Sequence, residues 1–281
     1  HKAADAVAKI DSARAAGVDI QANMYPYTAA GTGLDACFPP WASADGELFD
    51  NLADPEMRAR IRAEMEVQTE PWEAFCNLAT PGGTMPLGLN LPEHQKYSGW
   101  WLEDIAEDMG KDWIDTAMDL VLNERQRVGT MYFLMSEENV AMQIGQPWMK
   151  FGTDAGGVDP AEATGLVHPR AYGTFTRVLG KYVREEGVTT LEDAVRKMSS
   201  AVATRLNIRD RGFLREGYYA DVIVFDPETV GDHATYEEPH QLSTGIEHVF
   251  VNGIAVVTAG VHTGAMPGRA VRGPGWTGWV R

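Results

Sequence analysis

A Gly-Thr-Asp sequence, Gly152-Thr153-Asp154, follows an apolar, strand-like run in this chain and precedes Ala155 and Gly156. In α/β barrels, catalytic residues lie where parallel strands end and the following loops begin. A carboxylate at such a strand end can bind a metal or transfer a proton. The alternative is a turn-forming Asp that hydrogen-bonds to its own backbone. Asp154 is the first candidate site residue.

Three further side chains could bind a ligand. Arg170, in His168-Pro169-Arg170, has a planar guanidinium that suits a carboxylate, or it forms a structural ion pair. Tyr25 follows a strand-like stretch and could offer its hydroxyl or simply pack. His168 could approach a metal or donate to a substrate, or it could shape the loop before Pro169. All three alternatives stay open at this point.

Composition excludes several classes of function. The 281 residues carry a formal charge of −16, which disfavours nucleic acid as a partner because its binding requires clustered Lys and Arg. No apolar run reaches the roughly 18 residues that span a bilayer, so no membrane partner is expected. Cys37 and Cys76 form no CxxC motif, so we expect neither a disulfide framework nor a structural zinc site. We predict a reducing, cytoplasmic location.

The elements that must position these residues are of the α/β type. Apolar residues at helical spacing predict a helix over 2–16 that ends at Gly17, and 18–24 alternates like a strand. From 28 to 128 the pattern is irregular apart from helices at 55–67 and 113–122, which is typical of a functional insertion. We expect its tryptophans to form a small core; these are Trp41, Trp72, Trp100 and Trp101.

Regular α/β structure is predicted to resume at Gly129. Strands are expected at 130–135 and 148–153, and helices at 136–144, 171–186 and 190–207, the last capped by Thr190. After residue 209 the sequence is rich in β-branched residues, and Asn252-Gly253 is a strong hairpin turn. We therefore predict a separate antiparallel β-module over 209–281.

The chain is too short for the architecture that its pattern indicates. A closed (β/α)8 barrel takes about 250 residues. Outside the insertion and the β-module only two or three strand–helix units remain, and these cannot close a barrel. Either the chain is the last part of a longer protein, or the barrel assignment is wrong.

Several motifs resemble those of N-acyl-D-amino-acid deacylases (D-aminoacylases) of the amidohydrolase superfamily. The resemblance covers nearly the whole chain, and its most specific part runs from His168-Pro169-Arg170 to Leu179-Gly180-Lys181-Tyr182. The other motifs are Asn23-Met24-Tyr25-Pro26-Tyr27-Thr28, Gly33-Leu34-Asp35-Ala36, Gly152-Thr153-Asp154 and the run from Gly217 to Pro227.

The resemblance implies the last part of a (β/α)8 barrel over 1–208, with a lid insertion at 28–128 and a β-sandwich module at 209–281. Residues 18–24 and 148–154 would be the seventh and eighth strands. The family's HxH metal pair is absent from the chain, so only Asp154 can be assigned as a zinc ligand. The other ligands would lie upstream of His1 or in a second chain. His1 itself is expected to be a frayed terminal residue.

The resemblance also implies roles for the candidate residues. Asp154 would take the proton of the attacking water and pass it to the leaving amine, and Arg170 and Tyr25 would bind the carboxylate of the N-acyl amino acid. His168 is a weaker candidate for substrate binding. We expect the isolated chain to bind zinc weakly or not at all. The alternatives are an amidohydrolase acting on cyclic amides, such as hydantoinase or dihydroorotase, and an inactive chain that serves as an assembly partner.

Overall fold

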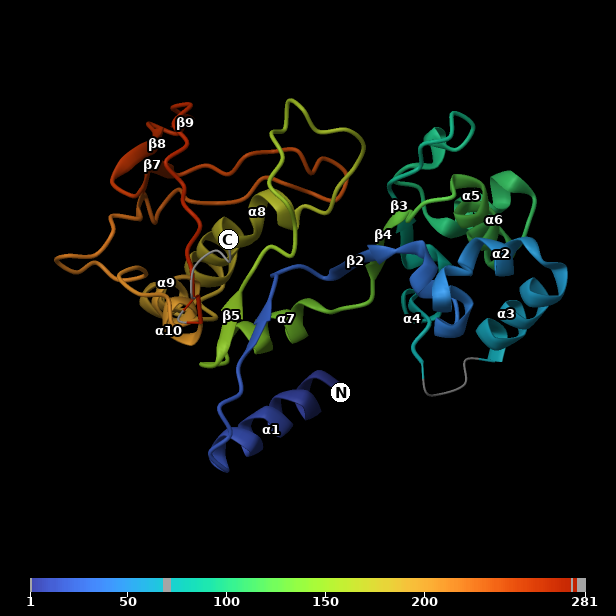
Figure 1. The fold of residues 1–281 in the computed structure, drawn as a ribbon, viewed down its shortest axis with the longest axis horizontal. Coiled ribbons are helices and arrows are strands. Elements are labelled where there is room, and N and C mark those ends of the chain that lie inside the picture. The colour runs from blue at the N-terminus through green and yellow to red at the C-terminus, as the bar shows by residue number, and fades with distance from the viewer. Residues whose placement is uncertain (1, 68–71, 274, 277–281) are drawn as a thin grey trace. The chain divides into compact units, whose positions relative to one another are not determined.

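The computed structural model describes residues 2–67, 72–273 and 275–276, so the prediction for His1 lies outside the described residues. Contacts divide the chain into two compact units (Figure 1). Unit 1 comprises His1–Pro26, Glu137–Glu162 and Pro169–Arg281, and unit 2 comprises Tyr27–Ser136 and Ala163–His168. None of the described helices is both long enough and apolar enough to cross a lipid bilayer.

Unit 1 contains two neighbouring parallel strands that are far apart in sequence. Strand β1 (Ala22–Met24) pairs with β5 (Met149–Phe151), with Asn23 opposite Lys150. Both strands were predicted, but both are shorter than predicted. A strand needs hydrogen bonds to a neighbouring strand. Only three residues of β5 pair with β1, so the stretch from Val18 to Gln21 has no strand partner in this pair.

Five helical segments of unit 1 lie between these strands in the sequence or follow them. They are α7 (Glu137–Ile144), α8 (Arg170–Arg177), the π-helical segment η5 (Val178–Glu185), α9 (Leu191–Met198) and α10 (Ser200–Arg205). Phe151 shares a hydrophobic core with residues of α7, η5 and α9, and Met24 packs against that core. Successive strand residues point to opposite faces, so Asn23 and Lys150 are directed away from this core.

Local signals predicted the helix ends better than the helix interiors. Helix α1 (Lys2–Ala15) is followed by Gly17 in the left-handed region, and the Thr190 side chain caps α9 by accepting from the Asp193 amide. The single helix predicted over 190–207 is wrong. It breaks at Ser199, whose φ of −129° and ψ of −85° separate α9 from α10.

Gly180, in the Leu179-Gly180-Lys181-Tyr182 motif, lies against the backbone of another segment. A Cβ at this position would come within 2.8 Å of the Val230 carbonyl oxygen. Gly180→Ala is therefore expected to lower the free energy of unfolding by about 1–3 kcal/mol, measured by urea denaturation. Gly156→Ala is the control, because a Cβ there meets no atom within 4 Å. Equal stability of the two variants would contradict the prediction.

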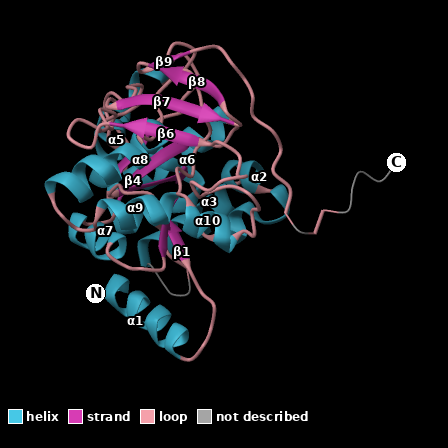
Figure 2. Ribbon diagram, turned by 90° about the vertical axis from the view of Figure 1, so that its left-hand side faces the viewer, coloured by secondary structure: helices cyan, strands magenta, loops and turns pink. Residues whose placement is uncertain are grey.

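The C-terminal segment forms one antiparallel sheet with strand order β6-β7-β8-β9 (Figure 2). The strands are β6 (Val222–Phe225), β7 (Ile246–Val251), β8 (Ile254–Thr258) and β9 (Val261–His262). Asn252 and Gly253, both with positive φ, form the turn between β7 and β8 as predicted. The predicted antiparallel β-structure is confirmed, and the second sheet of a sandwich stays a prediction.

Unit 2 combines a small antiparallel sheet with helices around its own core. The sheet order is β2 (Ala29–Gly33), β4 (Gly129–Phe133), β3 (Thr84–Pro86). The α-helices are α2 (Leu48–Ala53), α3 (Pro55–Val67), α4 (Phe75–Ala79), α5 (Leu102–Met109) and α6 (Trp113–Glu124). Short 3-10 helices are η1 (Leu34–Cys37), η2 (Pro40–Gly46), η3 (Pro81–Gly83) and η4 (Gln95–Tyr97).

Two predictions for this region need correction. The strand at Gly129 exists, but it pairs antiparallel with β2 and β3 and does not resume the parallel α/β pattern. Residue pattern identifies a strand but not its partner, which lies about 100 residues away in the register Gly33↔Gly129. Of the four tryptophans, Trp41 and Trp72 pack on the core as expected, whereas Trp100 is 41% exposed.

Cys37 and Cys76 form a disulfide inside the core of unit 2, which their spacing in sequence did not predict. The fold brings together two segments separated by 39 residues, and CxxC counting does not detect such a pair. Disulfides persist mainly in oxidising compartments. The cysteines therefore give no support to the predicted cytoplasmic location.

Glu124, at the end of α6, holds the loop that precedes η4. Its fully buried carboxylate accepts hydrogen bonds from the amides of Asn90 and Leu91, at 2.9 and 3.2 Å, and from His94 Nδ1 at 2.9 Å. Burial acts to raise the pKa of Glu124, but these hydrogen bonds outweigh it and hold the pKa below its usual value.

Glu124→Gln is expected to cost unit 2 about 1.5–3 kcal/mol of stability near neutral pH, because hydrogen bonds to a charged group are lost. The folded pKa is depressed, so this stabilisation is present above the unfolded pKa of about 4.5 and is lost as the pH falls through the lower folded value. Urea denaturation across this range should show the difference from the native chain shrinking in acid. Glu93→Gln, an exposed position in the same loop, should show no such pH-dependent difference.

Candidate active site

Asp154 lies just beyond the carboxyl end of β5. The strand stops at Phe151, and the amide of Gly152 still donates to the Met24 carbonyl at 3.1 Å, which keeps the end of β5 beside the end of β1. Asp154 then adopts a φ of +47°, a turn conformation that Asp tolerates. Its side chain is 71% exposed, so the carboxylate is accessible and not part of the core.

Arg170 starts α8 and reaches back to Asp154. Its Nη2 lies 2.9 Å from Asp154 Oδ2 and donates to the Asp154 backbone carbonyl at 2.8 Å. The arginine side chain is only 10% exposed, in contrast to its carboxylate partner. A buried guanidinium that is fixed by a backbone carbonyl is a rigid anion receptor. In this structure it binds the accessible carboxylate of Asp154.

Tyr25 completes the group from the end of β1. Its ring lies under the Arg170 guanidinium, with 4.4 Å between Arg170 Cζ and the ring centroid. Such a contact holds a cation by the charge distribution of the ring and limits its rotation. The structure thus brings Asp154, Arg170 and Tyr25 together from three segments of unit 1.

A cavity of about 550 Å³ adjoins this group. Asp154 and Tyr25 line it at the carboxyl ends of the two strands, and Asn23 and Lys150 line it from the strands themselves. This volume lies within the range of small-molecule sites. The carboxyl ends of parallel strands are also where α/β proteins bind their ligands.

His168 belongs to unit 2 and is 8% exposed. Its Nε2 lies 2.9 Å from the Ala29 carbonyl oxygen, and its ring makes an edge contact with Tyr27 at 5.4 Å between centroids. These contacts give His168 a part in shaping the loop before Pro169. Its predicted role in substrate binding stays a prediction.

Two further residues take part in the site, and sequence reasoning assigned them no role. Arg177 Nε donates to the Pro26 carbonyl at 2.9 Å and so anchors the chain immediately after Tyr25. Lys150 lies in the middle of β5, where its neighbours made it look like part of an apolar run. Only the position of Phe151 in the core, which the structure shows, places Lys150 on the face of the cavity.

A zinc ion needs more ligands than these residues offer. Catalytic zinc sites use three protein ligands and keep a position for water. In the described part of the chain no group of three or more His, Cys, Asp and Glu residues could hold a metal ion. Asp154 is a suitable oxygen ligand, but with Arg170 as its neighbour it does not form a zinc site by itself.

Comparisons with known proteins show which family the chain resembles. A model of the amidohydrolase family matches residues 147–257, which include β5 and Asp154. N-acyl-D-glutamate deacylase of Alcaligenes xylosoxydans xylosoxydans is 36% identical over 255 residues, which are 91% of this chain and 42% of that protein. The chain therefore spans less than half the length of this relative.

Solved structures give the same result. The crystal structure of a D-aminoacylase superposes with a TM-score of 0.68 at 32% identity, over 94% of this chain and 45% of that one. N-acyl-D-glutamate deacylase from Bordetella bronchiseptica, complexed with zinc and a phosphonate mimic of the tetrahedral intermediate, superposes with a TM-score of 0.64 at 35% identity, over 89% and 42%. The predicted resemblance is confirmed: the chain is similar to amidohydrolases, and in particular to N-acyl-D-amino-acid deacylases, over most of its length.

Proposed function

We propose that this chain is part of a hydrolase that cleaves the amide bond of N-acyl-D-amino acids. The observation that carries the proposal is the convergence of Asp154, Arg170 and Tyr25 at the carboxyl ends of two parallel strands, beside a cavity. An accessible carboxylate and a buried guanidinium are the two groups that such a substrate needs, one for its amide and one for its carboxylate. The relatives that bear deacylase names support the same reaction.

Asp154 would carry the proton. Its carboxylate takes a proton from the attacking water while the water oxygen bonds to the acyl carbon, and the same proton then passes to the amide nitrogen. The carbon–nitrogen bond breaks, and the products are a carboxylic acid and a free amino acid. The exposed side chain of Asp154 leaves room for water on the one side and substrate on the other.

Arg170 and Tyr25 would position the substrate. In this structure the Asp154 carboxylate occupies Arg170 Nη2, and the Asp154 backbone carbonyl holds the same nitrogen. A substrate carboxylate arriving at the guanidinium would replace the side-chain contact and leave the backbone contact intact. This exchange would release the Asp154 carboxylate for proton transfer.

We also propose that β1 and β5 are the last two strands of a (β/α)8 barrel, with residues 28–128 as a lid and 209–281 as a β-sandwich module. The parallel pairing of two strands separated by an inserted unit supports this assignment. Zinc is proposed as the cofactor, on the ground of the zinc-bound relative. Asp154 would be its one ligand from the described residues, and no reaction step is assigned to the metal.

A second candidate function is supported by the strand pair itself. In the described residues β1 pairs with β5 alone, so each strand has an edge free for pairing. Parallel sheets occur almost only when buried on both faces. The chain could thus serve as an assembly partner that adds its strands to another polypeptide, which would supply the metal ligands. Cyclic-amide hydrolysis remains the rival reaction, and no relative reported above bears such a name.

The assay should compare N-acetyl-D-glutamate, N-acetyl-D-methionine, their L enantiomers and a hydantoin, with zinc measured in the same purified protein. Release of amino acid from the D substrates alone supports the deacylase. Turnover of the hydantoin alone would contradict the deacylase proposal and support cyclic-amide hydrolysis. Zinc-free, inactive protein that gains both properties on addition of a second chain supports the assembly partner.

A further inference from the structure

A second cavity, of about 490 Å³, opens at the amino ends of β1 and β5. Pro147 and Trp148, which precede β5, and Asp19 and Gln21, which precede β1, line it. Asp154 and Tyr25 do not line this cavity; they follow the carboxyl ends of the same strands. It shares Gln21, Lys150 and Arg205 with the cavity beside Asp154, but it extends toward the opposite ends of the strands.

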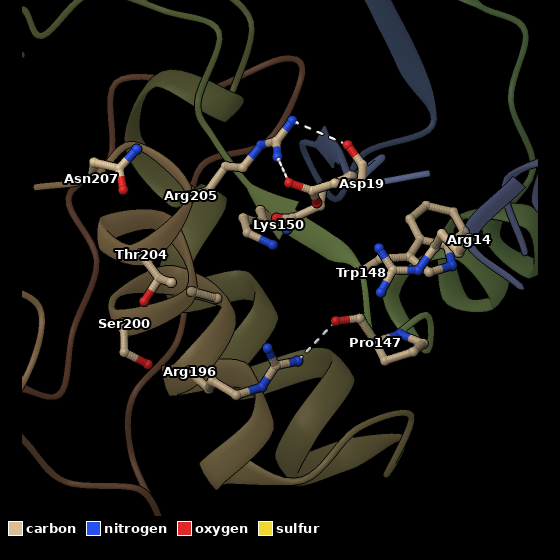
Figure 3. A pocket seen from close by; sticks show the side chains of 12 residues that line it. Arg14, Asp19, Pro147, Trp148, Lys150, Arg196, Ser200, Thr204, Arg205 and Asn207 are labelled. Atoms are coloured by element: carbon tan, nitrogen blue, oxygen red, sulfur yellow. Dashed lines mark hydrogen bonds and ion pairs between the residues drawn. The ribbon is translucent and has the colours of Figure 1, made fainter. Parts of the chain in front are cut away.

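Four cationic side chains line this cavity, in a chain whose formal charge is −16. Arg14 comes from α1, Lys150 from β5, Arg196 from α9 and Arg205 from α10, and Figure 3 shows Lys150 between Arg205 and Arg14, with Arg196 across the opening. The concentration of positive charge is set by the fold, because Arg14, Lys150 and the segment with Arg196 and Arg205 are far apart in sequence.

Among the described residues, two of these four cations are paired with carboxylates, and two are not. Asp19, the one carboxylate in the lining, is paired with Arg205. Arg14 Nη1 donates to the Ile20 carbonyl at 2.6 Å, so the partner of this guanidinium is a neutral group and not a carboxylate. Arg196 is bound to Asp193 outside the lining and donates to the Pro147 carbonyl at 2.9 Å.

Lys150 is the most informative member of this cluster. It is only 8% exposed, and within the described chain its ammonium has no carboxylate partner or hydrogen bond. Burial, together with the charges of Arg196, Arg14, Arg205 and Lys197, lowers the pKa of Lys150. An unpaired ammonium among like charges is unfavourable, and a bound anion would offset this repulsion.

We propose that this cavity binds a small phosphate-bearing molecule. Three guanidinium groups, one ammonium and the hydroxyls of Ser200 and Thr204 line the cavity, more donors than the two oxygens of a carboxylate can accept. A phosphate group offers three oxygens and up to two negative charges. Lys150 also lines the cavity beside Asp154, so the test measures binding of the anion and not deacylase activity.

Inorganic pyrophosphate is the probe, titrated by calorimetry into the purified chain in a phosphate-free buffer. We expect one site per chain and a rise in the melting temperature that grows with pyrophosphate concentration. Lys150→Gln should weaken binding roughly 10-fold, the effect of one charge-assisted hydrogen bond. Lys9→Gln removes the same charge from an exposed position on α1 and should change the affinity less than about 2-fold.

Arg14→Gln is the second variant, because Arg14 is exposed and its loss should not affect folding. It should weaken pyrophosphate roughly 3- to 10-fold even if Lys150→Gln fails to fold. Absence of binding at about 10 mM pyrophosphate, the range of non-specific contacts, would overturn the proposal. Equal weakening by Lys9→Gln, or tighter binding of malonate than of pyrophosphate, would also overturn it.

Discussion

Asp154→Asn is expected to lower kcat/KM for an N-acyl-D-amino acid by about 10³-fold in the active, zinc-loaded enzyme. Asparagine keeps the shape of the side chain and can still accept a hydrogen bond from Arg170, but it cannot take a proton from water. The loss should therefore fall on kcat, with a small change in KM. Steady-state kinetics on the native and variant enzymes measure it.

The control is Asp159→Asn in the same loop. Asp159 is exposed, and its carboxylate accepts from the Ala161 amide, which is a local turn contact. This variant should keep its activity to within about 3-fold, since a surface contact contributes less than about 1 kcal/mol. Comparable activity of Asp154→Asn and the native enzyme would remove Asp154 from the mechanism and leave it as a turn residue.

Arg170→Gln should raise KM for N-acyl-D-amino acids by roughly 100-fold, because a charge-assisted contact to the substrate carboxylate contributes about 1.5–3 kcal/mol. For a substrate that carries a carboxamide in place of the carboxylate, the same substitution should raise KM far less, because that substrate has no charge for Arg170 to bind. Arg170→Lys, which keeps the charge but not the planar fork, should give an intermediate KM. The comparison of the two substrates is the measurement that decides.

A structural role for Arg170 predicts a different result. If it only pairs with Asp154, the acid and the carboxamide should be affected equally, through kcat. Arg209→Gln, an exposed position in the same unit, controls for the change in charge and should leave both substrates unaffected. Equal loss on the two substrates would therefore exclude Arg170 as the carboxylate receptor.

Local sequence predicted many of the elements because their signals lie within a few residues. The helix over Pro55–Val67 begins at its proline, Thr190 caps α9, and Asn252-Gly253 turns the β7–β8 hairpin. Where the prediction failed, the deciding contact was distant. The partner of β4, the Cys37–Cys76 pair and the short length of β1 all depend on residues elsewhere in the chain.

The candidate site shows the same division. Asp154 and Tyr25 could be found from sequence, because each follows a strand-like stretch, and Arg170 because its motif resembles that of a family. Lys150 could not, since a lysine inside an apolar run gives no sign of which face it occupies. Only the packing of Phe151 on the helices directs Lys150 to the cavities.

The sequence by itself determined the types of side chain at the ends of two strands, and so the chemistry that they can perform. The tertiary structure alone decided that Asp154, Arg170 and Tyr25 meet, and that four distant cations surround one cavity. The physical reason is range. Propensity, capping and turns act over a few residues, whereas parallel strand pairing and helix packing join segments that more than 100 positions of chain separate, as in Ala22↔Met149.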